Sequence, residues 1–264
     1  MSKPDKQSVR AAFERAAETY DAAAVVQREV CGRLLDFSDR HPVTRSARRV
    51  VDAGCGTGYA LGLLHARFLD AEIIAMDFAP GMLLRMPVRD GYGCIRLCAD
   101  IEQLPLASES VDVLWSSLML QWCDSQRSLT EIARVLRPGG RAWIATLGPR
   151  TLWELREAFS DIDDAQHVID FESPEQLTAR AASAGLEVAG HEVDTVFALA
   201  PDLGGLLRDI KAIGAHQVGP TRRHGLFGKG VWRTLVGHYE RHRRVDGLLP
   251  ASYDATLLSL GKPG

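Results

Sequence analysis

The sequence predicts an α/β fold built on a mostly parallel sheet, and three observations carry this prediction. Short apolar runs alternate with helical segments over roughly the first 150 residues. A glycine-rich turn follows the first of these runs, and acidic residues stand where the next runs end. Such alternation is typical of right-handed βαβ units, in which ligands bind beyond the carboxyl ends of the strands.

Composition limits the class of protein further. The chain has 264 residues, of which 46% are hydrophobic and 25% charged, enough for one α/β core with an elaboration. No apolar stretch is long enough to span a bilayer, and residues 1–12 lack the apolar segment of a signal peptide. The five cysteines are irregularly spaced, which favours a reducing compartment. We therefore expect a cytoplasmic protein with no membrane partner.

The elements are expected in a regular order. Residues 6–38 follow helical spacing and predict two helices divided at Asp21, within an N-terminal helical cap over 1–44. Strands are predicted at 48–53, 72–77, 92–98, 111–116 and 141–147, and a Pro-Gly-Gly turn precedes the last of them at 138–140. Together these strands form the expected ligand-binding core, 45–150, of a single 264-residue domain.

Further elements follow the core. Helices are predicted at 150–160 and 173–184, the second beginning with Ser173 as N-cap and Pro174 at the first helical position. Strands are expected at 188–199 and 252–260. Between them lies an insertion, about 201–250, which we expect to be helical.

The glycine turn Asp52-Ala53-Gly54-Cys55-Gly56-Thr57-Gly58 is the most informative motif. Gly54, Gly56 and Gly58 let the backbone turn tightly and approach a ligand. A dinucleotide fingerprint would need glycine where Tyr59 stands, and the chain has no Gly-Lys-Ser/Thr of a P-loop. Asp52 would repel a pyrophosphate but suits a cationic ligand, so the motif predicts a nucleoside that carries positive charge.

S-adenosylmethionine has these features, since it combines a ribose with an ammonium, a sulfonium and one carboxylate. Asp77, at the end of the second apolar run, can accept the hydroxyls of a ribose. Asp100 and the amide of Ile101 follow the third run and can address the adenine edge. Ser116 ends the fourth run at the same edge of the sheet. The sequence therefore predicts S-adenosylmethionine as the cofactor.

A metal site is not predicted. Cys94 and Cys98 lie four residues apart in a strand-like run without a second pair of ligands. His238 and His242 have helical spacing, but the arginines that surround them would oppose a cation.

The insertion is basic. Its nine Lys and Arg residues stand against four acids, a net charge of +5, whereas the whole chain carries −3. A solvated helical surface explains such a cluster, and so does attraction of an acidic partner. Nucleic acid is not predicted as that partner, because no stacking pattern of interleaved aromatic residues accompanies the arginines.

The order of these motifs resembles the class I methyltransferases, whose Rossmann-like sheet has seven strands. Strings outside the core resemble one branch of them, the malonyl-carrier-protein O-methyltransferases of biotin synthesis (BioC family). These strings are residues 12–21, 116–123, 207–215 and 249–253. One difference is Ser117, where this family often has asparagine.

The resemblance implies an enzyme that methylates the free carboxylate of malonyl-acyl carrier protein, an early step of biotin synthesis. This carboxylate is ionised at neutral pH, so no general base is expected. We expect Tyr20 and Gln121 to act at the catalytic centre, with Trp122 as a wall of the substrate pocket. Candidate cations for the malonyl carboxylate are Arg150, Arg208 and Lys211, and those for docking the acidic carrier protein are Arg222, Arg223, Arg241, Arg243 and Arg244.

Two other functions stay open from the sequence alone. One is a methyltransferase of the same fold that acts on a quinone precursor or a small natural product. The other is a non-catalytic module that binds S-adenosylmethionine and regulates a partner.

Overall fold

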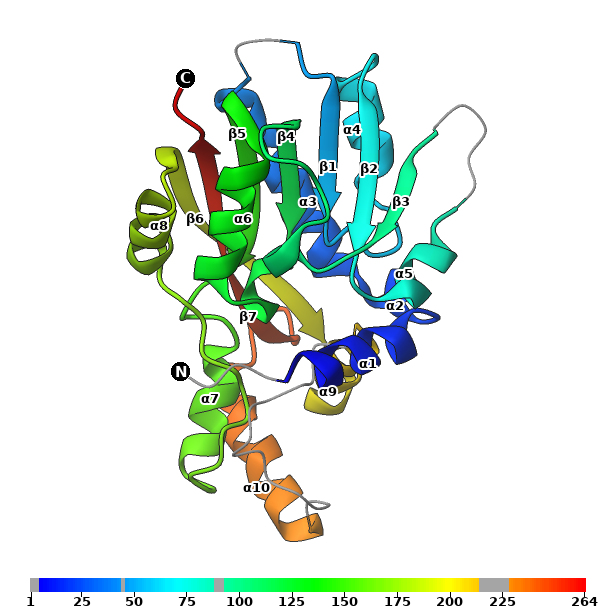
Figure 1. The fold of residues 1–264 in the computed structure, drawn as a ribbon. Coiled ribbons are helices and arrows are strands. Elements are labelled where there is room, and N and C mark those ends of the chain that lie inside the picture. Colours follow the sequence, from blue (N-terminus) through cyan, green and yellow to red (C-terminus); the bar gives the residue numbers. More distant parts are fainter. Residues whose placement is uncertain (1–4, 44–45, 88–92, 214–227) are drawn as a thin grey trace.

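The computed structural model describes residues 5–43, 46–87, 93–213 and 228–264. Its centre is a seven-stranded sheet in the order β3-β2-β1-β4-β5-β7-β6. The pairs among the first five strands are parallel, whereas β7 runs antiparallel to both β5 and β6 (Figure 1). The predicted mostly parallel sheet is thus confirmed. The strands are β1 Arg49–Ala53, β2 Glu72–Asp77, β3 Ile95–Cys98, β4 Val111–Ser117, β5 Leu136–Leu147, β6 Glu187–Ala200 and β7 Leu249–Gly261.

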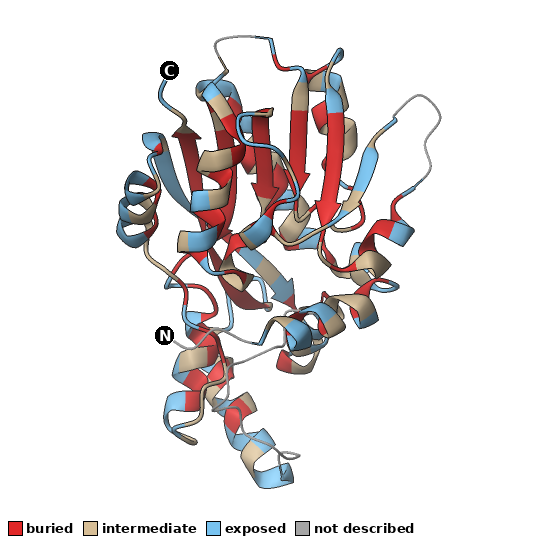
Figure 2. Cartoon of the chain, in the orientation of Figure 1, coloured by how far each residue is buried: buried red, intermediate tan, exposed pale blue. Residues whose placement is uncertain are grey.

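Helices cover both faces of the sheet because alternate strand residues point to opposite sides. Val50, Val113 and Trp143 pack in one apolar cluster with α3 (Val25–Arg40) and α4 (Leu61–Arg67). Val51 and Leu114 pack in the other with α6 (Ser125–Val135) and α8 (Pro174–Ser183). Figure 2 shows the central strands buried along their length, while the edge strands β3 and β6 are largely exposed.

In the described part of the chain, three helices precede the sheet, not the two expected. They are α1 (Lys6–Ala16), the single turn α2 (Tyr20–Ala23) and α3. The division falls around Asp21 as expected, but Thr19 and Ala24 each interrupt the helical bonding and leave a separate turn between them. The Thr19 hydroxyl donates to the carbonyl of Ala212 (3.1 Å), which ties this turn to a helix that follows β6.

The expected Pro-Gly-Gly turn before the fifth strand is wrong, because β5 already begins at Leu136. Val111 pairs with Leu136 and Val113 with Arg141, so residues 137–140 form a bulge inside the strand. Gly139 N–H donates to the Lys262 carbonyl (2.9 Å) and Lys262 N–H to the Gly140 carbonyl (3.0 Å). Pairing with Lys262 therefore holds this bulge within the strand.

Most elements after β5 lie at the carboxyl edge of the parallel strands, whereas α8 packs against a face of the sheet. Helix α7 (Trp153–Ser160) follows β5, and α8 begins with a capping box in which Ser173 and Gln176 bond each other's backbone, as its sequence predicts. Helices α9 (Leu203–Ala212) and α10 (Lys229–Tyr239) and the 3-10 turn η3 (Glu240–His242) lie between β6 and β7. No helix among the residues that the structure describes is long and apolar enough to cross a membrane.

Candidate functional site

The glycine turn after β1 is open on its outer side. Gly54, Gly56 and Gly58 all have positive φ, at 77°, 54° and 85°. A Cβ atom at Gly54 would lie 2.5 Å from the Cβ of Met119, so no other residue fits there without displacing the neighbouring loop. Backbone hydrogen bonds to β2 hold the turn in place, since the N–H groups of Gly54 and Cys55 both donate to the Met76 carbonyl. It thus offers a fixed backbone surface to a ligand.

Two carboxylates lie directly behind this turn. Asp77, at the end of β2, accepts from the N–H groups of Gly56 (2.9 Å) and Ala79 (2.8 Å). Asp52 is buried, and its Oδ2 has no hydrogen-bond partner among the described residues. Burial, and then the charge of Asp77, raise the pKa of Asp52 to about 7. Burial also raises the pKa of Asp77 to about 6, against the backbone donors that lower it.

A cavity of about 650 Å³, its mouth included, opens beside the turn. This volume falls within the range typical of small-molecule sites. Of the predicted site residues, those that line the cavity are Tyr20, Gly54, Gly56, Asp77, Asp100, Ile101 and Trp122. The glycines, Asp77, Asp100 and Ile101 come from strand ends as expected, whereas Tyr20 comes from α2.

Four of the residues predicted for the cofactor and the catalytic centre do not line this cavity. Asp52 and Gly58 lie behind its surface, and Ser116 is fully buried at the end of β4, where its neighbour Ser117 lines the wall instead. Gln121 bonds to the protein at both ends of its amide. Its Nε2 donates to the Leu118 carbonyl (2.7 Å), and its Oε1 accepts from the Thr146 hydroxyl (3.1 Å).

These bonds of Gln121 hold a strained part of the wall. Leu118 has a positive φ of 56°, which is uncommon for a branched residue. Its N–H donates to the Ala145 carbonyl (2.8 Å) while Gln121 holds its carbonyl. Gln121 therefore positions the loop that carries Leu118 and Met119 into the cavity.

The N-terminal helices close the cavity from the other side. The Phe13 ring on α1 lies edge-on to Trp122 (5.8 Å between centroids) and to Phe78 (6.4 Å). On α2, Asp21 accepts from the Thr57 hydroxyl of the glycine turn (2.5 Å). Glu14 accepts from the N–H of Gly81 at the start of α5 (Pro80–Arg85). Helices α1 and α2 are thus attached to the turn and to the element after β2.

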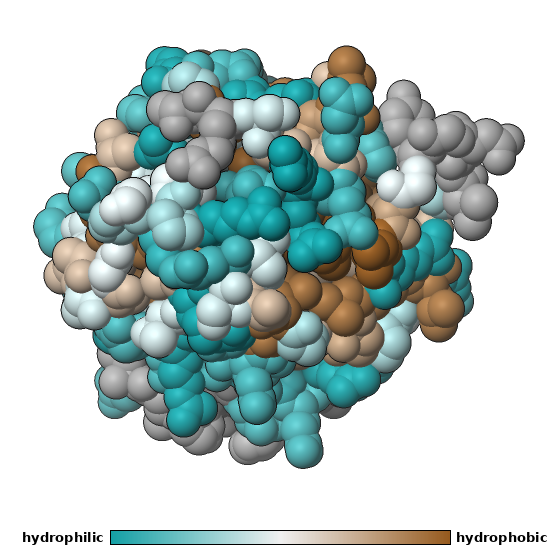
Figure 3. Space-filling view, turned by 45° about the horizontal axis from the view of Figure 1, so that its top comes forward, coloured by the Kyte–Doolittle hydropathy of each residue, from teal (hydrophilic) through white to brown (hydrophobic). Residues whose placement is uncertain are grey.

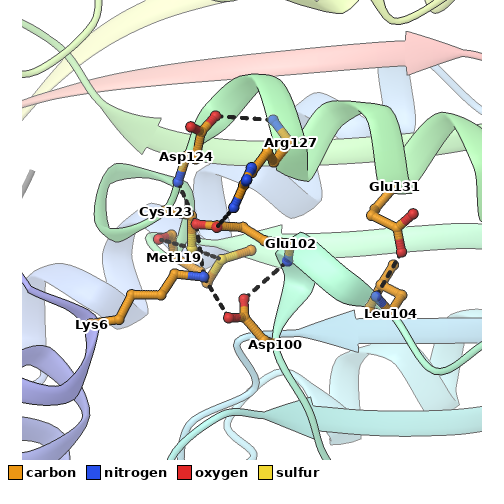
Figure 4. Close-up of polar contacts among 9 residues, drawn as sticks. All are labelled: Lys6, Asp100, Glu102, Leu104, Met119, Cys123, Asp124, Arg127 and Glu131. Atoms are coloured by element: carbon orange, nitrogen blue, oxygen red, sulfur yellow. Dashed lines mark hydrogen bonds and ion pairs between the residues drawn. The ribbon is translucent and has the colours of Figure 1, made fainter.

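Lys6 at the start of α1 is a site residue that sequence reasoning missed (Figure 4). Its ammonium contacts Asp100 Oδ2 (2.5 Å) and Glu102 Oε1 (2.8 Å) on the short turn η1 (Ile101–Gln103). Glu102 also accepts from the N–H of Asp124 (2.6 Å), the N-cap of α6. Asp100, expected at the adenine edge, therefore lies in an ion-pair network that joins α1 to the sheet edge.

The other missed residues that line the cavity share an apolar or sulfur-bearing character. They are Phe13, Met76, Phe78, Met82, Ala99, Leu118, Met119 and Cys123. Four of them, Phe78, Ala99, Leu118 and Met119, follow a strand end by one or two residues, which is a usable sequence signal. Figure 3 shows one face of the molecule, where hydrophilic side chains dominate and apolar side chains gather right of the centre, on the side that carries α5.

The three cations predicted for the malonyl carboxylate lie outside this cavity. Arg150 borders a second cavity, formed between α7 and the β6–β7 pair. Arg208 and Lys211 are exposed on α9. The structure therefore does not bring these three side chains to the glycine turn.

The residues predicted to dock a carrier protein divide into three groups. Arg222 and Arg223 lie outside the described residues. Arg243 is exposed but bonds Glu240 (2.6 Å) and two backbone carbonyls, and Arg244 pairs with Asp246 (3.1 Å). Arg241 is exposed and has no ion-pair partner in the described part of the chain.

The main cavity fits S-adenosylmethionine on the evidence of its own polar atoms. Ser117 Oγ, in the cavity wall, and Asp52 Oδ2, behind the cavity surface, are buried without partners among the described residues. A ligand donor would satisfy Ser117 directly, and a ligand's positive charge would offset the charge of Asp52. Each carboxylate oxygen of Asp77 accepts a hydrogen bond from one backbone N–H group, and the remaining lone pairs can accept hydrogen bonds from ribose hydroxyls. The apolar wall suits the adenine ring and the methylthio group.

Comparison with known proteins agrees with this site. Residues 51–144 match the family model described as a methyltransferase domain. The Bacillus subtilis protein YcgJ shares the fold alone, with a TM-score of 0.58 at 14% identity over 88% of this chain and 99% of that one.

Curated relatives match over almost the whole chain. The malonyl-[acyl-carrier protein] O-methyltransferase of Dechloromonas aromatica is 44% identical over 97% of this chain and 95% of its own. The biotin biosynthesis bifunctional protein BioHC of Cellvibrio japonicus is 40% identical over 98% of this chain and 51% of its own. Identity at this level includes the N-terminal helices and the region between β6 and β7, which a methyltransferase core alone would not match. The chain therefore belongs to the malonyl-[acyl-carrier protein] O-methyltransferase family.

Proposed function

We propose that this protein methylates the free carboxylate of malonyl-acyl carrier protein with S-adenosylmethionine and so acts early in biotin biosynthesis. The observation that carries the proposal is the full-length similarity to malonyl-[acyl-carrier protein] O-methyltransferases, joined to a cavity with unpaired buried acceptors behind a glycine turn. When bound, S-adenosylmethionine supplies a methyl group on a sulfonium, which passes to the carboxylate oxygen as the S–C bond breaks, leaving a thioether and a methyl ester.

The residues of the cavity act by position and by exclusion of water. A malonyl carboxylate is already ionised at neutral pH, so it needs no base. Phe13, Trp122 and Leu118 form an apolar wall in which opposite charges attract more strongly than in water. Alignment alone is worth an effective molarity of roughly 10⁵ M or more. Tyr20 caps the methionine and methyl region, and Gln121 acts indirectly by holding Leu118.

The outer elements serve the substrate. We propose that residues 1–44 act as a cap over the cofactor and that the 201–250 insertion is the substrate lid. Arg208 and Lys211 on α9 and Arg241 after α10 face solvent, where they can attract an acidic carrier protein. Arg150 binds a part of the substrate away from the malonyl carboxylate, because it lines the second cavity.

Mass spectrometry of malonyl-acyl carrier protein after incubation with the protein and S-adenosylmethionine tests the function. We expect one added methyl group on the malonyl form and none on acetyl-acyl carrier protein, which lacks a free carboxylate. Absence of methylation, with cofactor binding shown separately by calorimetry, would return the acceptor to quinone precursors and small natural products.

A further inference from the structure

A second cavity of about 820 Å³, its mouth included, lies at the same sheet edge as the cofactor cavity. Among the described residues, none lines both cavities. Helix α7, strands β6 and β7 and the turn η3 form its walls. The residues that line it include Arg150, Trp153, Phe197, His242, Arg244 and Ser252.

Two guanidinium groups border this cavity with donors to spare. The Arg150 side chain has no hydrogen bond or ion pair with any described residue, while its backbone N–H donates to Asp254 Oδ2 (3.1 Å). Arg244 lies 5.7 Å from the centroid of the Phe197 ring and pairs with Asp246 through Nε (3.1 Å). Its two terminal nitrogens have no partner in the described ranges. Several N–H donors therefore remain for an anion.

The aromatic rings of Trp153 and His242 also line the cavity. The imidazole of His242 lies edge-on to Trp153, with 5.0 Å between ring centroids, and its Nε2 lies 3.9 Å from Glu157 Oε2. The Trp153 indole N–H donates to Ser252 Oγ (3.2 Å). These contacts hold the rings of Trp153 and His242 in place in the wall of the cavity.

Two acids also line the cavity, but their charge is directed into the protein. Glu154 accepts from both the N–H (3.1 Å) and the hydroxyl of Ser252. Asp254 accepts from the backbone N–H of Arg150 and is nearly buried. Because both acids are buried whereas Arg150 and Arg244 are exposed, the arginines are the charged groups at the mouth of the cavity.

The distance between the two cavities matches the length of a pantetheine arm. The cofactor cavity lies at the ends of β1, β2 and β4, and the second lies at β7 and β6, which follow β4 and β5 in the sheet. Three strand spacings from β4 to β6 amount to roughly 15 Å. A pantetheine arm is comparable in length to an extended peptide of about five residues, or roughly 17 Å.

We propose, resting on the proposed function, that this second cavity binds the phosphate of the carrier protein's phosphopantetheine arm. Arg150 and Arg244 bond the phosphate oxygens, and the pantoyl part lies against Trp153 and Phe197. The arm then runs along the sheet edge and places the malonyl end in the cofactor cavity. Guanidinium groups suit this task because their paired donors match phosphate geometry.

Inhibition of malonyl-acyl carrier protein methylation by 4′-phosphopantetheine, by pantetheine and by inorganic phosphate at equal ionic strength tests this site. We expect phosphopantetheine to inhibit at least about ten-fold better than either of the other two, because it alone fills both parts of the cavity. In Arg150→Gln and Arg244→Gln that advantage should fall toward one. Arg40→Gln is the matched control, since Arg40 is exposed, pairs with Glu192 and lines neither cavity, and should keep the advantage.

Equal inhibition by phosphopantetheine and pantetheine in the unaltered protein would overturn the proposal, as would a full advantage in both arginine variants. Inhibition by inorganic phosphate as strong as that by phosphopantetheine would mean a free-phosphate site instead. Calorimetry of S-adenosylmethionine binding shows whether each variant is folded. Failure of the proposed function is distinguishable, because then malonyl-acyl carrier protein would not be methylated at all.

Discussion

The carboxylate of Asp52 lies buried below the glycine turn with one oxygen unpaired among the described residues, and Asp77 lies close enough to disfavour its charge. The protein thus holds two acids whose ionised forms are costly without a ligand. A cofactor that brings an ammonium and ribose hydroxyls compensates both. Cofactor binding and ionisation of these acids are therefore linked.

This linkage predicts the pH dependence of cofactor affinity. Free-protein pKa values of about 7 for Asp52 and about 6 for Asp77 mean that protons compete with the ligand as pH falls. If both acids must be ionised, the Kd rises roughly 100-fold from pH 7.5 to pH 5.5, about 25-fold of it from Asp52. Calorimetry of S-adenosylmethionine binding across this range measures the change.

Asp52→Asn should bind weakly at pH 7.5 and lose most of the remaining pH dependence, keeping only the roughly four-fold step due to Asp77. A Kd that stays constant from pH 7.5 to pH 5.5 in the unaltered protein would show that neither acid faces the cofactor.

The side chain of Tyr20 lines the cofactor cavity beside the glycine turn. Its Cε1 lies 3.8 Å from where a Cβ of Gly56 would stand, and its hydroxyl has no hydrogen-bond partner among the described residues. The ring, and not the hydroxyl, should therefore matter. We expect Tyr20→Phe to keep near-normal kcat/KM and Tyr20→Ala to lower it by about 10- to 100-fold through loss of enclosure. Tyr59→Ala, at an exposed tyrosine beside Gly58, is the control. Equal losses in Tyr20→Phe and Tyr20→Ala would instead make the hydroxyl essential.

At the scale of elements, local motifs predicted much of the molecule. The glycine turn, the strand ends and the Ser173 capping box depend on neighbouring residues, so the sequence alone locates them. The bulge in β5 was not predictable in this way. It depends on pairing with Lys262, more than a hundred residues away. Ladder partners at that separation override the turn preference of Pro-Gly-Gly.

The candidate site shows the same limit. Residues after β1, β2 and β3 were predicted because strand ends converge at one edge. Lys6 and Phe13 were missed because their place in the site depends on where α1 packs, and no local pattern encodes that. Arg150 was predicted at the carboxyl edge of the sheet, where it lies, but it was assigned to the malonyl carboxylate. The strand order β5, β7, β6 places it farther along this edge, at the second cavity.

The ion pairs of Lys6 attach helix α1 to the turn η1. Lys6 bonds Asp100 and Glu102 with side chains that are 36%, 40% and 10% exposed, so the network is only partly screened by water. Lys6→Met should loosen α1 from η1 and raise the Kd for S-adenosylmethionine about two- to five-fold, since such pairs are worth up to about 1 kcal/mol. Calorimetry measures the change. Lys262→Met, which breaks a comparable pair with Glu109 away from the cavity, is the control and should leave the Kd unchanged. Tighter binding in Lys6→Met would instead mean that Lys6 competes with the cofactor for Asp100.

At the scale of the whole molecule, charge is unevenly placed. The 201–250 insertion carries a net +5 while the remainder of the chain carries −8. Helix α9 of the insertion contacts the N-terminal turn through Thr19 and Ala212, and both lie at the carboxyl edge near the two cavities (Figure 1). A carrier protein attracted to the insertion is therefore delivered beside the route to the cofactor.

This arrangement predicts that ionic strength affects the carrier-protein substrate alone. At 0.1 M salt the screening length is about 10 Å, so attraction between exposed charges fades above that concentration. We expect kcat/KM for malonyl-acyl carrier protein to fall about ten-fold between 50 and 500 mM salt, mainly through slower association. The value for malonyl-pantetheine, which carries no protein charge, should change less than about two-fold.

Arg241 and Arg243 separate docking from structure within the insertion. Arg241→Ala should lower kcat/KM for the carrier protein about three- to ten-fold at low salt and flatten its salt dependence, because this guanidinium is exposed and unpaired among the described residues. Arg243→Ala should act mainly on thermal stability, since Arg243 bonds Glu240 and the carbonyls of Pro201 and Gly247. Arg40→Ala, an exposed cation before β1 at the opposite edge of the sheet, is the matched control. If turnover of the carrier protein did not respond to salt, attraction by the insertion would be excluded, and recognition would depend on the arm alone.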